Sequence, residues 1–232
     1  MKYSLPLFLL LFCFCQDTFA QNEQIRTYQF AKGQVFDIIF LTTKKAQLDA
    51  QQTYLKNIFP VAQKEGYHGL KGFSIPDAPT QGNYHPRSMI FGYWNSLQHR
   101  EQGMTSIEQT FEDFHQQRRN IWSTFAMTYF DLKEDLDFSV NLEKYNVSTA
   151  FWGRKDQEIQ TYMEQWKKAV RKQGGRIIVK LEDGVSPFGY TYQPDVLIIT
   201  EWDSEAAFSD FDAKSARIDR AAMQQINQFH IQ

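Results

Sequence analysis

Three side chains in this sequence are candidates for moving a proton: Asp37, His68 and His85. Asp37 stands inside the apolar run V-F-D-I-I-F-L, where an ionised carboxylate is costly unless it is paired or hydrogen-bonded. Such a residue is an acid–base group with a perturbed pKa in a cavity, a carboxylate paired with an arginine such as Arg118, or part of a strand end that is less buried than the pattern suggests. The run therefore makes Asp37 the first candidate for catalysis.

The two histidines are weaker candidates, because a turn or surface position is the more usual explanation for each of them. His68 stands between Gly66 and Gly69, at the predicted start of a strand, and His85 precedes another strand. A neutral histidine beside an apolar cavity can act as a general base near neutral pH, and it can also ligate haem iron. Both roles remain open at this point.

Five further residues are candidates for binding a substrate: Tyr84, Trp94, Arg118, Tyr192 and Trp202. The four aromatic residues recur at equivalent places in two parts of the chain, which fits either packing within a repeated unit or an aromatic lining that stacks on a ligand. Arg118 can bind an anionic ligand or pair with Asp37, although a solvated helix face is the alternative.

Motifs of the common enzyme classes are missing from the sequence. It contains no G-x-S-x-G, H-E-x-x-H, G-x-x-x-x-G-K-[ST], G-x-G-x-x-G or C-x-x-C-H, and its histidines do not have metal-ligand spacing. We therefore predict no metal site and no cofactor.

The first twenty residues have the pattern of a cleavable signal peptide. Lys2 precedes an apolar run of about ten residues, too short to span a bilayer core that needs ~20, and small or compact residues precede a predicted cut after Ala20. Both cysteines, Cys13 and Cys15, lie in this segment, so the mature chain has no disulfide. We expect a secreted or periplasmic protein with no membrane segment after cleavage, and an N-terminal extension over residues 21–33.

The rest of the chain contains one unit twice. Tyr84 and Tyr192 lie 108 positions apart, and the string Y-x-P-x-x-x-I-x-x-x-W-[ND]-S follows from each of them. F-x-D-F also occurs twice, and the first copy carries an insertion of about eleven residues around 97–107 between the two motifs. Such an insertion either borders a binding site or is neutral.

Hydrophobic periodicity predicts the same order of elements in both copies, β-α-β-β-α-β. For residues 34–138 the expected elements are strand 35–41, a helix carrying Leu48 to Ala62, strands 70–75 and 88–94, a helix over about 105–125, and strand 127–132. For residues 139–232 they are strand 147–152, a helix carrying Ile159 to Val170, strands 177–181 and 196–202, a helix over 206–223, and strand 226–231. Residues 131–144 show neither period and are expected to be a connector.

Two successive units of this order describe two ferredoxin-like halves in an α+β protein. The element order and the strings from Ile90 to Ser96 and from Ile198 to Ser204 resemble the dimeric α+β barrel superfamily. The resemblance implies two sheets packed face to face as a single-chain pseudo-dimer. That superfamily includes cofactor-independent monooxygenases, lactone isomerases and haem-handling enzymes, and no residue of a particular branch is matched here.

The composition excludes some partners and by itself favours a well-packed core over a ligand cavity. A formal net charge of −2 gives no electrostatic attraction to nucleic acid, whereas 20 Phe, 11 Tyr and 5 Trp suit either a packed core or an apolar cavity. We predict binding of a small apolar or aromatic molecule, with metal-free oxygenation or isomerisation as the enzymatic hypothesis. A non-catalytic ligand-binding or interaction module and a haem-handling protein are the alternatives, and a monomer or a homodimer is expected.

Overall fold

The computed structural model describes residues 24–155 and 158–232. The predicted signal peptide lies outside the described residues. The first half contains β2 (Val35–Thr43), α1 (Leu48–Lys64), β3 (Tyr67–Ser74), β4 (Ser88–Trp94), α2 (Leu97–Thr110), α3 (Phe114–Ile121) and β5 (Trp122–Asp131). The second half contains β7 (Tyr145–Gly153), α4 (Gln160–Lys172), β8 (Arg176–Glu182), β9 (Val196–Trp202), α5 (Glu205–Ser215) and β10 (Met223–Ile231).

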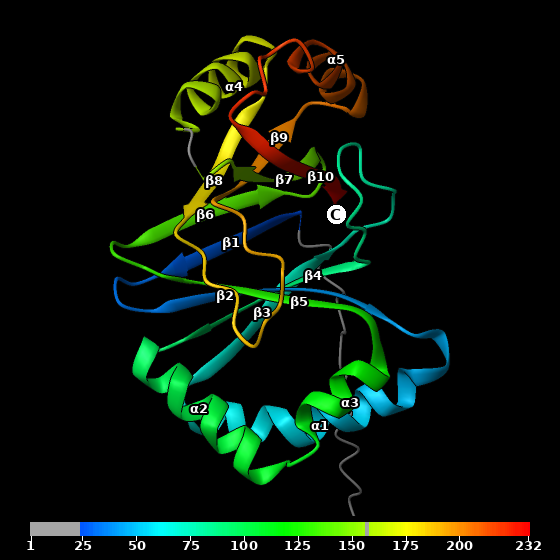
Figure 1. Ribbon diagram of the computed structural model, residues 1–232, viewed down its shortest axis with the longest axis vertical. Helices are drawn as coiled ribbons and strands as arrows, with labels where there is room; N and C mark the ends of the chain where they lie inside the picture. The colour runs from blue at the N-terminus through cyan, green and yellow to red at the C-terminus, as the bar shows by residue number, and fades with distance from the viewer. Residues whose placement is uncertain (1–23, 156–157) are drawn as a thin grey trace, which may run out of the picture.

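Each half forms a four-stranded antiparallel sheet with the same strand order. The orders are β3-β4-β2-β5 and β8-β9-β7-β10, which is the ferredoxin-like arrangement. The prediction of an α+β protein built from two such halves is confirmed. The two sheets face each other, with α1, α2 and α3 outside the first sheet and α4 and α5 outside the second (Figure 1).

Aromatic side chains fill the space between the sheets, because both inner faces are apolar. Tyr84 and Tyr192, the residues that begin the two repeated strings, meet there with ring centroids 4.6 Å apart. The ring of Tyr192 also contacts Phe40 and Trp152, and its hydroxyl donates to Asn227 Oδ1 at 3.1 Å. The symmetry that relates the two copies thus brings their equivalent tyrosines together in the main core.

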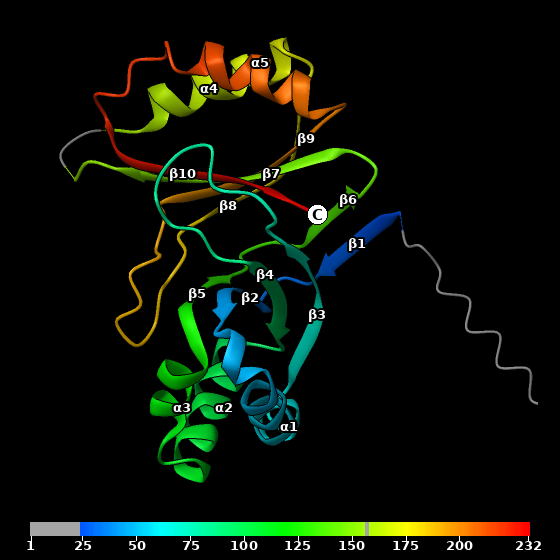
Figure 2. The ribbon, with the colours of Figure 1, turned by 90° about the vertical axis from the view of Figure 1, so that its right-hand side faces the viewer.

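The loop that leads into each string crosses to the opposite half (Figure 2). Residues 75–87 reach the second half, where Gln81 forms a β-bridge with Gln228. Residues 183–195 reach the first half, where Val185 forms a β-bridge with Tyr129. Each half therefore contributes a loop that packs on the other half.

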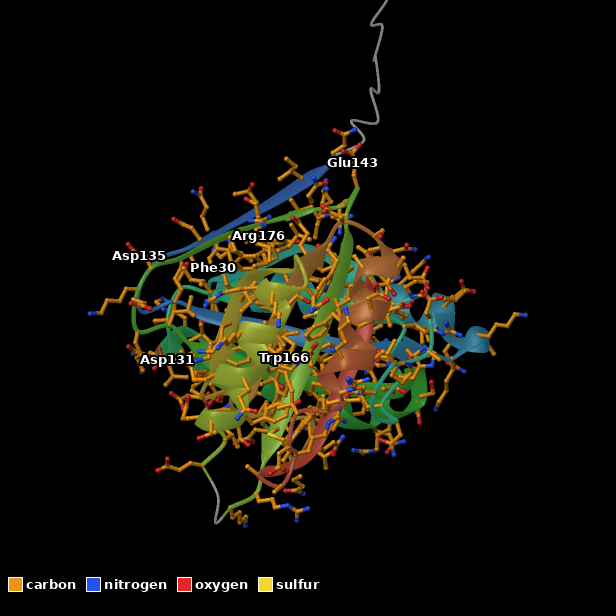
Figure 3. All side chains as sticks on the ribbon, turned by 90° about the horizontal axis from the view of Figure 1, so that it is seen from above. Phe30, Asp131, Asp135, Glu143, Trp166 and Arg176 are labelled. Carbon is orange, nitrogen blue, oxygen red and sulfur yellow. The ribbon has the colours of Figure 1, made fainter. Side chains whose placement is uncertain are left out.

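A two-stranded ribbon lies beside the two sheets, where the sequence predicted no regular structure. Its strands, β1 (Ile25–Phe30) and β6 (Leu136–Asn141), pair with each other and contribute Tyr28, Phe30 and Phe138 to the core. Asp135 and Glu143, just outside the two ends of β6, mark this edge of the molecule in Figure 3. The expectation of an irregular connector was wrong because the partner strand lies about a hundred residues away in the N-terminal extension.

The helices of the first half also differ from the prediction. The insertion is itself a helix, α2, which begins after Ser96, whose hydroxyl caps the backbone N–H of His99. The predicted single helix over 105–125 is replaced by α2 and α3, and β5 begins at Trp122 rather than at 127. In the second half, α5 stops at Ser215 instead of extending to 223.

Replacing Tyr192 by Ala should destabilise the protein by about 3–5 kcal/mol, because it leaves a cavity between the sheets and removes a buried hydrogen bond. Phe188→Ala is the control, since Phe188 lies in the same loop but is 44% exposed. Urea unfolding of both variants measures the difference. Equal losses in the two variants would contradict a core formed by the repeated tyrosines.

Candidate functional site

A pocket of about 470 Å³ lies in the first half, between the outer face of its sheet and the three helices. Its walls are mostly apolar and come from β2, β3, β4 and β5 on one side and from α1, α2 and α3 on the other. The polar groups of Asp37, Tyr54, Tyr67, Trp94, Arg118 and Trp122 line it, together with those of Thr42, Thr43, Gln51, Arg87 and Ser88. An apolar pocket with a few convergent polar groups is the usual form of a small-molecule site.

Asp37 is the only carboxylate among the described residues that line this pocket, and it is 2% exposed. Trp94 Nε1 donates to its Oδ2 at 2.8 Å, and Arg100 Nε donates to its Oδ1 at 3.3 Å. Burial raises the pKa of Asp37 above its ordinary value, while the Arg100 guanidinium and the Trp94 N–H oppose that rise. The carboxyl group is therefore held in a fixed orientation beside an apolar space.

Tyr67 brings a hydroxyl group near Asp37, and the glycine at position 92 makes room for it. Gly92 faces Asp37 across the strand pair, and a Cβ on Gly92 would lie 2.1 Å from Tyr67 Oη. Burial, with the nearby charge of Asp37, raises the pKa of Tyr67 well above its ordinary value, so this hydroxyl stays protonated and can donate.

Arg118 lies at another part of the pocket wall, between two aromatic rings. Its guanidinium carbon lies 4.0 Å from the Phe114 ring centroid and 4.6 Å from that of Phe125. Its Nε donates to Tyr54 Oη at 2.8 Å, and its Nη1 donates to Tyr190 Oη at 3.2 Å. Tyr190 belongs to the loop from the second half, so a residue of that half helps to hold the Arg118 side chain in place.

The equivalent place in the second half is filled. Val147 faces Thr200 across β7 and β9, as Asp37 faces Gly92 in the first half. The indole N–H of Trp202, the equivalent of Trp94, donates to Thr200 Oγ1 at 3.0 Å instead of to a carboxylate. A packed cluster that includes Trp166, Phe208 and Phe211 occupies the space under α4 and α5.

The structure brings only some of the predicted site residues together. Asp37, Trp94 and Arg118 line the pocket. His68 is exposed and stacks on Tyr93, and His85 lies in the crossing loop outside the pocket. The remaining three candidates also lie elsewhere: Tyr84 and Tyr192 meet between the sheets, and Trp202 is in the second-half core.

Four residues of the site are missed by reading the sequence: Tyr54, Tyr67, Arg100 and Trp122. The partner of Asp37 is Arg100 and not the suggested Arg118. Arg100 lies in the insertion of the first copy, one turn after the Ser96 cap, so the insertion itself was the available indication. Within the described ranges no cluster of histidine, cysteine and acidic residues could hold a metal ion, and no helix is long and apolar enough to cross a membrane.

The raised pKa of Asp37 predicts a pH-dependent difference in stability between the protein and its Asp37→Asn variant. The folded state holds this proton more tightly than the unfolded chain, so the stabilisation is complete below the ordinary value of 3.8 and is lost as the pH rises through the raised value. Stability relative to the variant should therefore fall over that window. Urea unfolding from about pH 3 to about pH 8 measures it, and a difference that stays constant with pH would contradict the shift. Asp203→Asn is the control of opposite sign, because Lys144 lowers the pKa of Asp203.

No known family model matches this chain, and no curated protein matches it. Solved structures do resemble it. An anthrone oxidase-like protein is 13% identical to this chain with a TM-score of 0.46, and the alignment covers 88% of this chain and 94% of that protein's chain. A chlorite dismutase from Candidatus Nitrospira defluvii, in complex with imidazole, is 8% identical to this chain with a TM-score of 0.49. The alignment covers 87% of this chain and 92% of that protein's chain. The strand order and facing sheets of the chain itself give it the dimeric α+β barrel fold within one polypeptide.

Proposed function

We propose that this protein binds a small, largely apolar molecule in the first-half pocket and that Asp37 moves a proton on it. The observation that carries the proposal is a buried, oriented carboxylate lining an apolar pocket in one half, while the other half has Val147 at that place and a packed core. Functional carboxylates often occupy such desolvated positions, because burial adjusts their pKa.

The proposed chemistry begins with ionised Asp37 accepting a proton from an acidic C–H or O–H group of the bound molecule. Return of that proton to a different atom of the substrate is an isomerisation. Reaction of the resulting anion with dioxygen is an oxygenation. Tyr67, whose hydroxyl stays protonated, is placed to donate a hydrogen bond to the developing anion.

Export is part of the proposal and rests on the signal-like first twenty residues. We propose a monomer as the sufficient unit, because the two halves already cover each other's inner sheet faces. The haem-handling alternative gains no support from the site, since no histidine is among the described residues that line the pocket.

A non-catalytic binding module is the second candidate, and one observation favours it. Both oxygens of Asp37 already accept hydrogen bonds, from Trp94 and Arg100, as expected for a structural carboxylate. Both proposed functions use the same pocket, but only the enzyme would convert the bound molecule to a product.

Closing the pocket should abolish binding under both candidates. Leu55→Trp adds bulk on α1 at a residue that lines the pocket, whereas Leu48→Trp adds the same bulk on α1 at a residue that is 55% exposed and outside it. We expect the first variant to lose at least about tenfold in affinity for a bound aromatic compound and the second to keep it. Calorimetric titration measures both, and retention of binding by Leu55→Trp would contradict the proposed site.

Asp37→Asn tests catalysis separately from binding. In a screen of quinol-like and enone compounds, followed by oxygen uptake and absorbance, the variant should lose about 10²–10⁴-fold in kcat. Its affinity for the same compound should change little, because Asn has a similar size and keeps an acceptor. Asp203→Asn, an exposed change in the second half, should retain activity. Undiminished turnover by Asp37→Asn would remove the catalytic role and leave the binding module.

A further inference from the structure

Arg118 is a buried cation that forms no salt bridge with a carboxylate of the described residues. It is 7% exposed, and within residues 24–155 and 158–232 no carboxylate lies within salt-bridge distance of it. Its hydrogen-bond acceptors, Tyr54 and Tyr190, are hydroxyl groups, and burial raises the pKa of Tyr54 to about 12. The Tyr54 phenol therefore stays neutral and does not balance the charge. Buried arginines are rare unless they are paired.

Arg100, the other buried arginine in this half, shows the usual arrangement. It is 1% exposed and pairs with Asp37 at 3.3 Å and with Glu101 at 3.1 Å. The negative charge of Asp37 is thus already balanced by Arg100. Arg118 is thus the buried guanidinium at the pocket wall that, among the described residues, forms no salt bridge with a carboxylate.

Trp122 supplies a second, independent observation at the same pocket. Its side chain is 4% exposed and lines the pocket, and its Nε1 is buried without a hydrogen-bond partner. Its ring lies against that of Tyr54, the hydroxyl acceptor of Arg118, with centroids 5.0 Å apart. A buried N–H donor without a partner is uncommon in folded proteins and needs an acceptor from elsewhere.

These features belong to the first copy only. Counted from the last residue of the repeated F-x-D-F motif, Arg118 corresponds to Ser215 in the second copy. Ser215 is buried, and its hydroxyl donates to the backbone carbonyl of Asp212 at 2.9 Å. The buried arginine without a salt bridge and the pocket therefore occur in the same copy of the repeat.

We infer that the first-half pocket takes an apolar molecule with one anionic group, a carboxylate, that binds to Arg118 and Trp122. The inference rests on the proposed function in that it requires the pocket to bind a small molecule. Arg118 uses its Nε and one N–H of Nη1 within the protein, so its Nη2 and the other N–H of Nη1 remain to donate to a carboxylate. The Trp122 N–H supplies a further donor, and the aromatic and aliphatic walls hold the apolar body.

Two fluorescent probes with one aromatic frame test this inference. Anilinonaphthalene sulfonate carries an anionic group, and N-phenyl-naphthylamine is its neutral counterpart. In the folded protein we expect both to bind with one site, and Arg118→Gln to weaken the anionic probe about tenfold or more while leaving the neutral probe within about twofold. Arg119→Gln, an exposed neighbour on the same helix, should change neither. Displacement of the anionic probe by naphthoate but not by naphthamide identifies the carboxylate.

Trp122→Phe keeps the ring and removes the N–H, so it tests the same inference if Arg118→Gln fails to fold. We expect it to weaken the anionic probe about threefold to tenfold and to spare the neutral one. Equal effects on both probes in these variants, or equal displacement by naphthoate and naphthamide, would overturn the anionic subsite and leave the proposed function intact. Binding of neither probe, with Leu55→Trp indistinguishable from the unaltered protein, would contradict the proposed function as well.

Discussion

The structure depends on one requirement: a four-stranded sheet with helices on one face must bury its other face. The tandem repeat meets this requirement within one chain, since each copy supplies the cover for the other. The inner faces of both sheets are lined with aromatic residues, and the equivalent tyrosines Tyr84 and Tyr192 meet at the centre. The two crossing loops and the ribbon of β1 and β6 then close the sides of this core.

The inner faces of the two sheets pack against each other in both copies. The side chains that differ between the copies therefore lie on the outer faces, beneath the helices. In the second copy the outer face is a second core, with large aromatic residues beneath α4 and α5. In the first copy the extra helix α2 adds Arg100, which allows Asp37 to be buried where the second copy has Val147. Gly92, in place of Thr200, leaves room for the Tyr67 hydroxyl. A few residue differences between the two copies therefore distinguish a half with a pocket from a half with a packed core.

The sequence predicted the fold well where the pattern is local. Periodicity and the repeated strings indicated both ferredoxin-like halves, their order and their pairing. It failed at β1 and β6, because neither strand has a partner nearby in the chain. The site was predicted only through Asp37, Trp94 and Arg118, each unusual within its own segment. Local sequence patterns could not assign Arg100, Tyr67 and Trp122 to the site. They come together there only because α2, β3 and β5 pack against one another in the folded protein.

The asymmetry between the two copies is the central claim, and xenon binding tests it directly. Xenon enters apolar cavities that are large enough to hold it, without requiring a cognate ligand. A crystal structure of the protein under xenon pressure should show xenon in the first half, between its sheet and α1 to α3, and none between the second sheet and α4 and α5. Xenon in both halves, or in the second half alone, would contradict a single pocket and the account of function built on it.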